Sequence, residues 1–266
     1  MKKIKWVSSL TAFCVVTLLC VQFAGYNARQ KYIQVSKGFS IPMGNYILLT
    51  KEADVDCDGK NDRIYVYGEK KSKDAEYAER INLVVVYAKN GFVKKTNVSH
   101  IKGYVDDVVV QDFTGNKNKD VLLKTFTDEG KSIISVFVAD FGYDIPKTIM
   151  ADSRGISPSF SFAEGFVVNC SLINGQNFSV NLESKKQMLV GKGVFDDNGK
   201  LVKSEKVFAR PFLKVDAKKS DKDKGYELEG VQTVVFGGKE TELFKIYSVQ
   251  KFMGRKWELI RIEVKY

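Results

Sequence analysis

The chain of 266 residues contains one histidine, four cysteines and four prolines. The single histidine, His100, rules out a metal site built from several imidazoles, and we interpret it as a surface residue. No C-x-x-C pair occurs, so zinc-finger and thioredoxin-like chemistry has no support. A G-x-S-x-G elbow and a glycine-rich phosphate loop are also missing. We therefore expect a protein without a catalytic site.

The strongest chemical pattern is a run of aspartates that reads Asp54-Val-Asp-Cys-Asp-Gly-Lys-Asn-Asp62. Carboxylates occupy positions 1, 3, 5 and 9, and glycine occupies position 6. A hard cation such as Ca²⁺ binds six to eight oxygens, and a tight turn with alternate acidic side chains supplies them. The expected ligands are the side chains of Asp54, Asp56, Asp58 and Asp62 and the main-chain carbonyl of Lys60.

The loop differs from an EF-hand, which requires a glutamate at position 12 and two flanking helices. Position 12 is Tyr65, and the flanks 46–49 and 64–67 are aromatic and β-branched, which favours strands. The segment therefore predicts a calcium loop that joins two strands. The alternative is a solvated acidic hairpin turn without an ion.

Two weaker copies of the loop follow. The first starts 58 residues later and offers the oxygen-bearing side chains of Asp112, Thr114, Asn116 and Asp120, with lysine in place of the glycine at position 6. Because it has two acids rather than four, we expect weaker binding. The second copy, Lys219–Glu227, begins with lysine and is expected to hold no ion.

An apolar strand, a D-x-[DT]-x-[DN] turn and a second apolar strand resemble the FG-GAP/VCBS-type repeats of bacterial secreted and surface proteins. The resemblance extends over residues 45–127 and weakly over 210–266. The resemblance implies a propeller-blade-like antiparallel sheet stabilised by Ca²⁺. It predicts the fold and the bound cation, but not the biochemical function. About 240 exported residues allow roughly four units of this length, the lower limit for a closed propeller.

The N-terminus predicts export. Lys2, Lys3 and Lys5 precede an uncharged apolar stretch that ends at Asn27, as in a signal peptide. The stretch is also just long enough to act as an uncleaved membrane anchor, with the remainder outside the cytoplasm. Cys20 leaves a lipoprotein signal open. The protein is thus predicted to be secreted or membrane-anchored, and Cys57 and Cys170 are interpreted as free thiols rather than a disulfide.

The remaining sequence reads as strands and turns. Asn-Gly pairs at 90–91, 174–175 and 198–199 each separate apolar runs, which is the strongest short-range hairpin signal. Only residues 74–80 have a briefly helical or loop-like pattern. We predict an all-β fold, either a partial propeller of blade-like repeats or two packed β-sheets, preceded by an N-terminal signal or anchor helix. The segments are 1–27, a repeat region 28–155 with both calcium loops, and a second β region 156–266 with a degenerate repeat.

Charge indicates the class of partner. After removal of the three signal lysines, 39 lysines and arginines face 32 acids, a net charge of +7. A basic surface outside the cell attracts anionic partners, so we expect an envelope or cell-surface component, either an anionic polymer or a protein. The positive charges show no interleaving with aromatics, so nucleic acid is not expected. The sequence predicts a non-catalytic binding or scaffolding module; the alternative is an exported wall-active hydrolase that uses carboxylates.

Overall fold

The structure is a computed structural model that describes residues 32–97, 100–221 and 225–266. The predicted signal or anchor helix within residues 1–27 lies outside the described residues. Strands make up 57% and helix 4%, and the antiparallel sheets do not close, so the all-β prediction is confirmed. Within the described part of the chain, no helix is long and apolar enough to cross a membrane.

The first sheet is a four-stranded antiparallel meander in chain order. Its strands are β3 (Asn45–Ala53), β4 (Asp62–Glu69), β5 (Glu79–Val86) and β6 (Val93–Asn97). The predicted turn at Asn90-Gly91 separates β5 from β6, and Gly91 adopts the positive φ of 70° that suits glycine. A separate hairpin of β1 (Tyr32–Ser36) and β2 (Phe39–Pro42) precedes this sheet.

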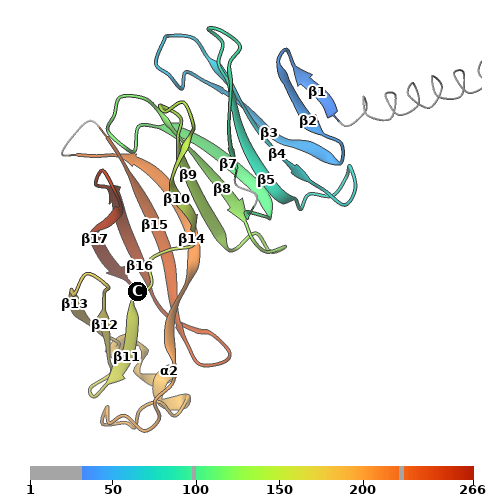
Figure 1. The fold of residues 1–266 in the computed structure, drawn as a ribbon. Coiled ribbons are helices and arrows are strands. Elements are labelled where there is room, and N and C mark those ends of the chain that lie inside the picture. The colour runs from blue at the N-terminus through green and yellow to red at the C-terminus, as the bar shows by residue number, and fades with distance from the viewer. Residues whose placement is uncertain (1–31, 98–99, 222–224) are drawn as a thin grey trace, which may run out of the picture.

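The second sheet has eight strands and begins with another four-stranded meander. Its strands are β7 (Tyr104–Gln111), β8 (Asp120–Phe126), β9 (Ile134–Asp140), β10 (Lys147–Ser153), β14 (Val207–Lys219), β15 (Tyr226–Phe236), β16 (Thr241–Phe252) and β17 (Trp257–Lys265). The order is β17-β16-β15-β14-β9-β8-β7, and β10 pairs with β9. One antiparallel pair, Phe212 with Ile134, joins β14 to β9, and in Figure 1 the four long C-terminal strands lie beside the second meander.

A small lobe lies at the far end of the molecule from β1 and β2 (Figure 1). It contains β11 (Ser159–Ala163), β12 (Val167–Ser171), β13 (Asn177–Asn181), a short 3₁₀ turn and α2 (Lys186–Gly191). The sequence analysis missed this helix, because six residues with only Leu189 buried give no helical periodicity. Residues 74–80, for which the sequence left a brief helix or a loop open, form a turn and the start of β5.

A shared hydrophobic core holds the two meanders together. Ile64 and Leu83 of the first meander pack in one buried cluster with Leu123 and Phe137 of the second. β-Branched and aromatic residues on facing strands therefore bury one side of each meander against the other. The consequence for function is that the loops after β3 and β7 are brought to the same edge of the molecule.

The third predicted loop, Lys219–Glu227, is a hairpin connection between β14 and β15. Ser220 donates a main-chain hydrogen bond to Gly225 at 2.9 Å, and residues 222–224 lie outside the described range.

Candidate metal centre

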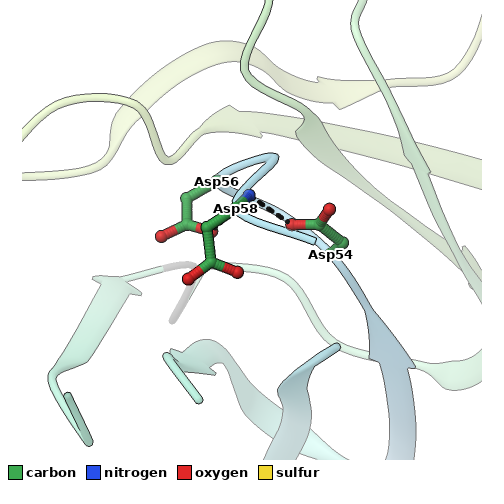
Figure 2. Close-up of side chains that lie close together, drawn as sticks. All are labelled: Asp54, Asp56 and Asp58. Carbon is green, nitrogen blue, oxygen red and sulfur yellow. Dashed lines mark hydrogen bonds between the residues drawn. The ribbon is translucent and has the colours of Figure 1, made fainter. Parts of the chain in front are cut away.

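Three of the predicted ligands meet in the loop between β3 and β4. One carboxylate oxygen from each of Asp54, Asp56 and Asp58 lies within 4.8 Å of the others. Figure 2 shows these side chains on the loop, with the Asp58 main-chain N–H donating to Asp54. Two oxygens bound to one Ca²⁺ at about 2.3–2.6 Å are at most about 5 Å apart. The cluster is therefore already compact enough for one hard cation.

The loop backbone is folded around the first aspartate. The carboxylate of Asp54 accepts hydrogen bonds from the main-chain N–H groups of Asp58 and Gly59, each at 3.0 Å. Asp58 in turn accepts one from Lys60 N–H at 2.9 Å. A short polar side chain that bonds backbone a few residues ahead stabilises a tight turn. Lys60 itself is exposed, as expected for a residue that would contribute only its carbonyl.

Asp62, the predicted ligand at position 9, is placed differently. It begins β4, is only 1% exposed, and accepts hydrogen bonds at 2.9 Å from the N–H groups of Val55 and Ala88. Burial raises the pKa of this carboxyl, the two N–H groups oppose that shift, and the negative charges of Asp56 and Asp58 add to it. Asp62 therefore anchors the base of the loop, and within the described residues it does not join the compact group of Asp54, Asp56 and Asp58.

The second loop, between β7 and β8, has the same architecture. Asp112 accepts main-chain hydrogen bonds from Gly115, Asn116 and Lys117, as Asp54 does in the first loop. Asp120 corresponds to Asp62: it is fully buried and accepts a 2.8 Å bond from the N–H seven residues earlier. The two loops, 58 residues apart, therefore share the hydrogen bonds of their first and last aspartates.

The predicted ligands of the second loop are less closely grouped, and one of them contacts an acid that the sequence analysis did not single out. Thr114 Oγ1 lies 3.5 Å from Asp112 and 3.4 Å from Asp120, and Asn116 donates to buried Asp140 at 2.8 Å. Asp140 is the cross-strand partner of Asp120. Burial, together with the negative charge of Asp140, raises the pKa of Asp120 to about 7. The only sequence signal for Asp140 is an acid at the end of an apolar strand.

The two loops lie side by side. Lys119 N–H donates to Val55 C=O at 3.0 Å, and the Cys57 thiol lies 3.3 Å from Lys117 C=O. Cys57 is exposed and Cys170 is buried, and both are free thiols, as predicted.

Acidic residues outside the two loops, which the alternative hydrolase would need for catalysis, have structural partners. Asp106 and Asp107 form ion pairs with Lys124 and Lys51 at 3.4 and 3.3 Å. Asp128 caps its own loop through Ser132 and Ile133.

Asp196 lies in a hairpin turn and accepts hydrogen bonds from the N–H groups of Asn198 and Lys200, each at 2.9 Å. His100 is exposed and stacks edge-on near Phe137, with ring centroids 6.4 Å apart.

Comparison with known families gives one match. Residues 157–265 match the family model described as the YybI C-terminal domain. No curated protein and no solved structure matched the chain. The match covers β11 to β17 and contains neither of the two aspartate loops.

Proposed function

We propose that this protein is an exported, calcium-stabilised β-repeat protein that acts as a non-catalytic binding or scaffolding module at the cell surface or envelope. The observation that carries the proposal is the convergence of Asp54, Asp56 and Asp58 within 4.8 Å. Three carboxylates at this distance repel one another, and a bound Ca²⁺ relieves the repulsion. The second, looser loop binds the same ion more weakly.

The two meanders act as blade-like units of a partial propeller. Each has four antiparallel strands in chain order and an aspartate loop between its first and second strand. The inter-loop hydrogen bond from Lys119 to Val55 supports a role for the cations in holding the two units together. In this proposal the calcium is structural, and the partner binds elsewhere.

The best surface for an anionic partner is a groove of about 740 Å³ on the sheet formed by β14 to β17. Five cations and three acids line it: Lys214, Lys218, Lys245, Arg261, Lys265, Asp216, Glu229 and Glu263. Most cations are paired with neighbouring acids, such as Lys214 with Asp216 at 2.6 Å. Exposed pairs of this kind contribute little to stability, so a polyanion can replace the acids as the partner of the lysines.

Melting curves test the calcium proposal. A cation that binds only the folded state stabilises it by RT ln(1 + [L]/Kd), about 2.7 kcal/mol at a concentration one hundred times Kd. We expect Ca²⁺ to raise the Tm of the wild-type protein and Asp56→Ala to remove most of the increase. An unchanged Tm over millimolar Ca²⁺ would refute the proposal.

A pull-down tests the partner. Wild-type protein is expected to retain a phosphate-rich wall polymer from envelope extracts, and a Lys214→Glu/Lys245→Glu/Lys265→Glu variant is expected to lose it. Turnover of peptidoglycan fragments by the wild type would instead favour the alternative, an exported wall-active hydrolase.

A further inference from the structure

The first meander and the hairpin before it expose apolar side chains at one end. Tyr32, where β1 begins, is 66% exposed, and Ile33 is 48% exposed. Met43, in the turn between β2 and β3, is 61% exposed. Tyr32 pairs with Pro42, the residue before Met43, so the three apolar residues lie at the same end of the hairpin. Single exposed apolar residues are ordinary, but several together at one end of a molecule indicate an interaction surface.

Basic side chains lie at the same end. The loop after β4 begins Lys70-Lys-Ser-Lys-Asp74, and the pairing of Asn45 with Glu69 places it beside the turn between β2 and β3. Lys70 Nζ lies 5.3 Å from the centre of the Tyr46 ring, which agrees with this placement. Three lysines and one aspartate give residues 70–74 a net charge of +2. We call Tyr32, Ile33, Met43, Lys70, Lys71 and Lys73 the β1 end.

The lysines of the β1 end differ from those of the basic groove, most of which are paired with acids. Among the residues that the structure describes, no ion pair engages the three lysines of this loop. Two nearby acids already have partners, since Glu69 pairs with Arg80, and Glu76 pairs with Lys131 at 3.0 Å. The positive charges of the loop are therefore available to an anion outside the protein.

The chain joins the β1 end to the apolar stretch that is predicted to act as an export signal or anchor. That stretch ends at Asn27 and β1 begins at Tyr32, so residues 28–31 connect them. Four residues span at most about 14 Å when they are fully extended. An anchored chain therefore keeps the β1 end close to the bilayer, whereas the small lobe lies at the far end of the molecule (Figure 1).

A bilayer with anionic headgroups matches both features of the β1 end. Tyrosine is enriched where membrane and water meet, because its ring is apolar and its hydroxyl is polar. Isoleucine and methionine gain free energy when they leave water for the boundary of the acyl chains. Lysine side chains extend to the headgroups, and anionic lipids attract them over about a Debye length. Apolar insertion and charge attraction therefore act together at this end.

We propose that the β1 end rests on a bilayer with anionic headgroups. Tyr32, Ile33 and Met43 enter the membrane interface, and Lys71 and Lys73 contact the headgroup phosphates. This inference rests on the export in the proposed function and deepens it, because it specifies which end of the protein faces the membrane. The aspartate loop after β3 lies at the opposite end of the same strands and so faces the aqueous phase.

Fluorescence quenching locates the β1 end relative to the bilayer. The full-length chain has two tryptophans, Trp6 and Trp257, so every reporter protein carries Trp6→Phe and keeps Trp257 as a common background. Met43→Trp places an indole at the β1 end, and the matched control Ile173→Trp places one at a fully exposed position of the small lobe. In vesicles of phosphatidylglycerol and acyl-brominated phosphatidylcholine, we expect quenching of the Met43→Trp protein. The Ile173→Trp protein should show none.

Charge reversal tests the role of the lysines. Lys71→Glu/Lys73→Glu in the Met43→Trp protein should reduce the quenching to the level seen in vesicles of phosphatidylcholine alone. The same charge change on the small lobe, Lys192→Glu/Lys200→Glu, should leave the quenching unchanged. Salt at about 1 M, where the Debye length is about 3 Å, should act as the first pair does. All four lysines are exposed, so both variants should keep the wild-type Tm in detergent.

Three results would overturn the proposal. The first is an absence of quenching in both the Met43→Trp protein and a second reporter, Tyr32→Trp. The second is quenching that the charge reversal at Lys71 and Lys73 does not change. The third is an emission shift that grows with protein concentration in detergent, without quenching in vesicles, which would assign the β1 end to a second copy of the chain.

The same proteins separate this proposal from the proposed function. Their Tm is measured with and without Ca²⁺ in detergent. A Ca²⁺-dependent increase in Tm without quenching would refute the membrane contact alone. Quenching without such an increase would support the membrane contact and refute the calcium part of the proposed function.

Discussion

Lys117 adopts the same left-handed backbone, with φ 76°, as Gly59 does with φ 88° at the corresponding position of the neighbouring loop. At position 4 the residue types are exchanged: Cys57 has φ 59° and Gly115 has φ 74°. A residue with a Cβ pays about 1–2 kcal/mol in this region of backbone space. Each loop thus has one glycine and one strained residue at these two positions. The two loops share a backbone conformation there, although the residue types differ.

The first prediction follows from this strain. Lys117→Gly should stabilise the protein by about 0.5–1 kcal/mol, the steric relief less the extra chain entropy of glycine. Gly59→Ala should destabilise it by about 1 kcal/mol, although its Cβ would meet open space. Urea unfolding in the absence of Ca²⁺ measures both. A Lys117→Gly protein less stable than the wild type would contradict the prediction.

The second prediction separates Asp62 from the acidic cluster. Asp62→Asn replaces an acceptor of a buried N–H with a donor and should cost about 1–3 kcal/mol with or without Ca²⁺. Asp56→Asn should leave the cation-free stability nearly unchanged and remove the Ca²⁺-dependent increase in Tm. Thermal melts in EDTA and in Ca²⁺ measure the two effects, and equal behaviour of the two variants would be inconsistent with these separate roles.

The third prediction ranks the loops. Calorimetry should show tighter Ca²⁺ binding to the Asp54–Asp62 loop than to the Asp112–Asp120 loop, because only the first brings three carboxylates within 4.8 Å. Asp56→Ala should remove binding at the first loop, so that the affinity of the second is measured alone. Asn116→Ala should remove binding at the second loop, so that the first is measured alone. The Lys219–Glu227 segment should bind no measurable ion. Equal affinities at the first two loops would refute the order.

The fourth prediction concerns pH. The pKa of Asp120 is about 7 in the folded protein and near 3.8 when unfolded. Between these values the folded state holds a proton that the unfolded state has released, so cation-free stability should fall as pH rises from about 4 to about 7. Urea midpoints in EDTA measure this slope, and Asp120→Asn should flatten it. If the pH dependence of stability persists in the Asp120→Asn protein, another titratable group causes it.

The fifth prediction concerns the thiols. Burial raises the pKa of Cys170 to about 11, whereas Cys57 is exposed. The thiolate is the reactive form, so iodoacetamide at pH 8 should label Cys57 in the folded protein and Cys170 only after urea unfolding. Peptide mass spectrometry distinguishes the two sites. Equal labelling of both in the folded state would show that Cys170 is accessible.

The sequence predicted the features that depend on neighbouring residues. Asn-Gly at 90–91 and 174–175 marks observed hairpins, since turn chemistry acts over four residues. The spacing of Asp54, Asp56 and Asp58 was sufficient to place three carboxylates together, because alternate residues of a tight loop point the same way. The brief helix α2 escaped prediction, because its contacts rather than its periodicity stabilise it.

What the sequence alone determined is thus local: the all-β class, the turns and the first acidic loop. The tertiary structure decided which aspartate carboxylates accept hydrogen bonds from remote residues and which remain grouped on the loop. Asp62 is paired because Ala88, 26 residues away, donates to it, and Asp140 faces Asp120 because strand register places it there. Such contacts depend on the pairing of remote strands, which short-range propensities do not specify.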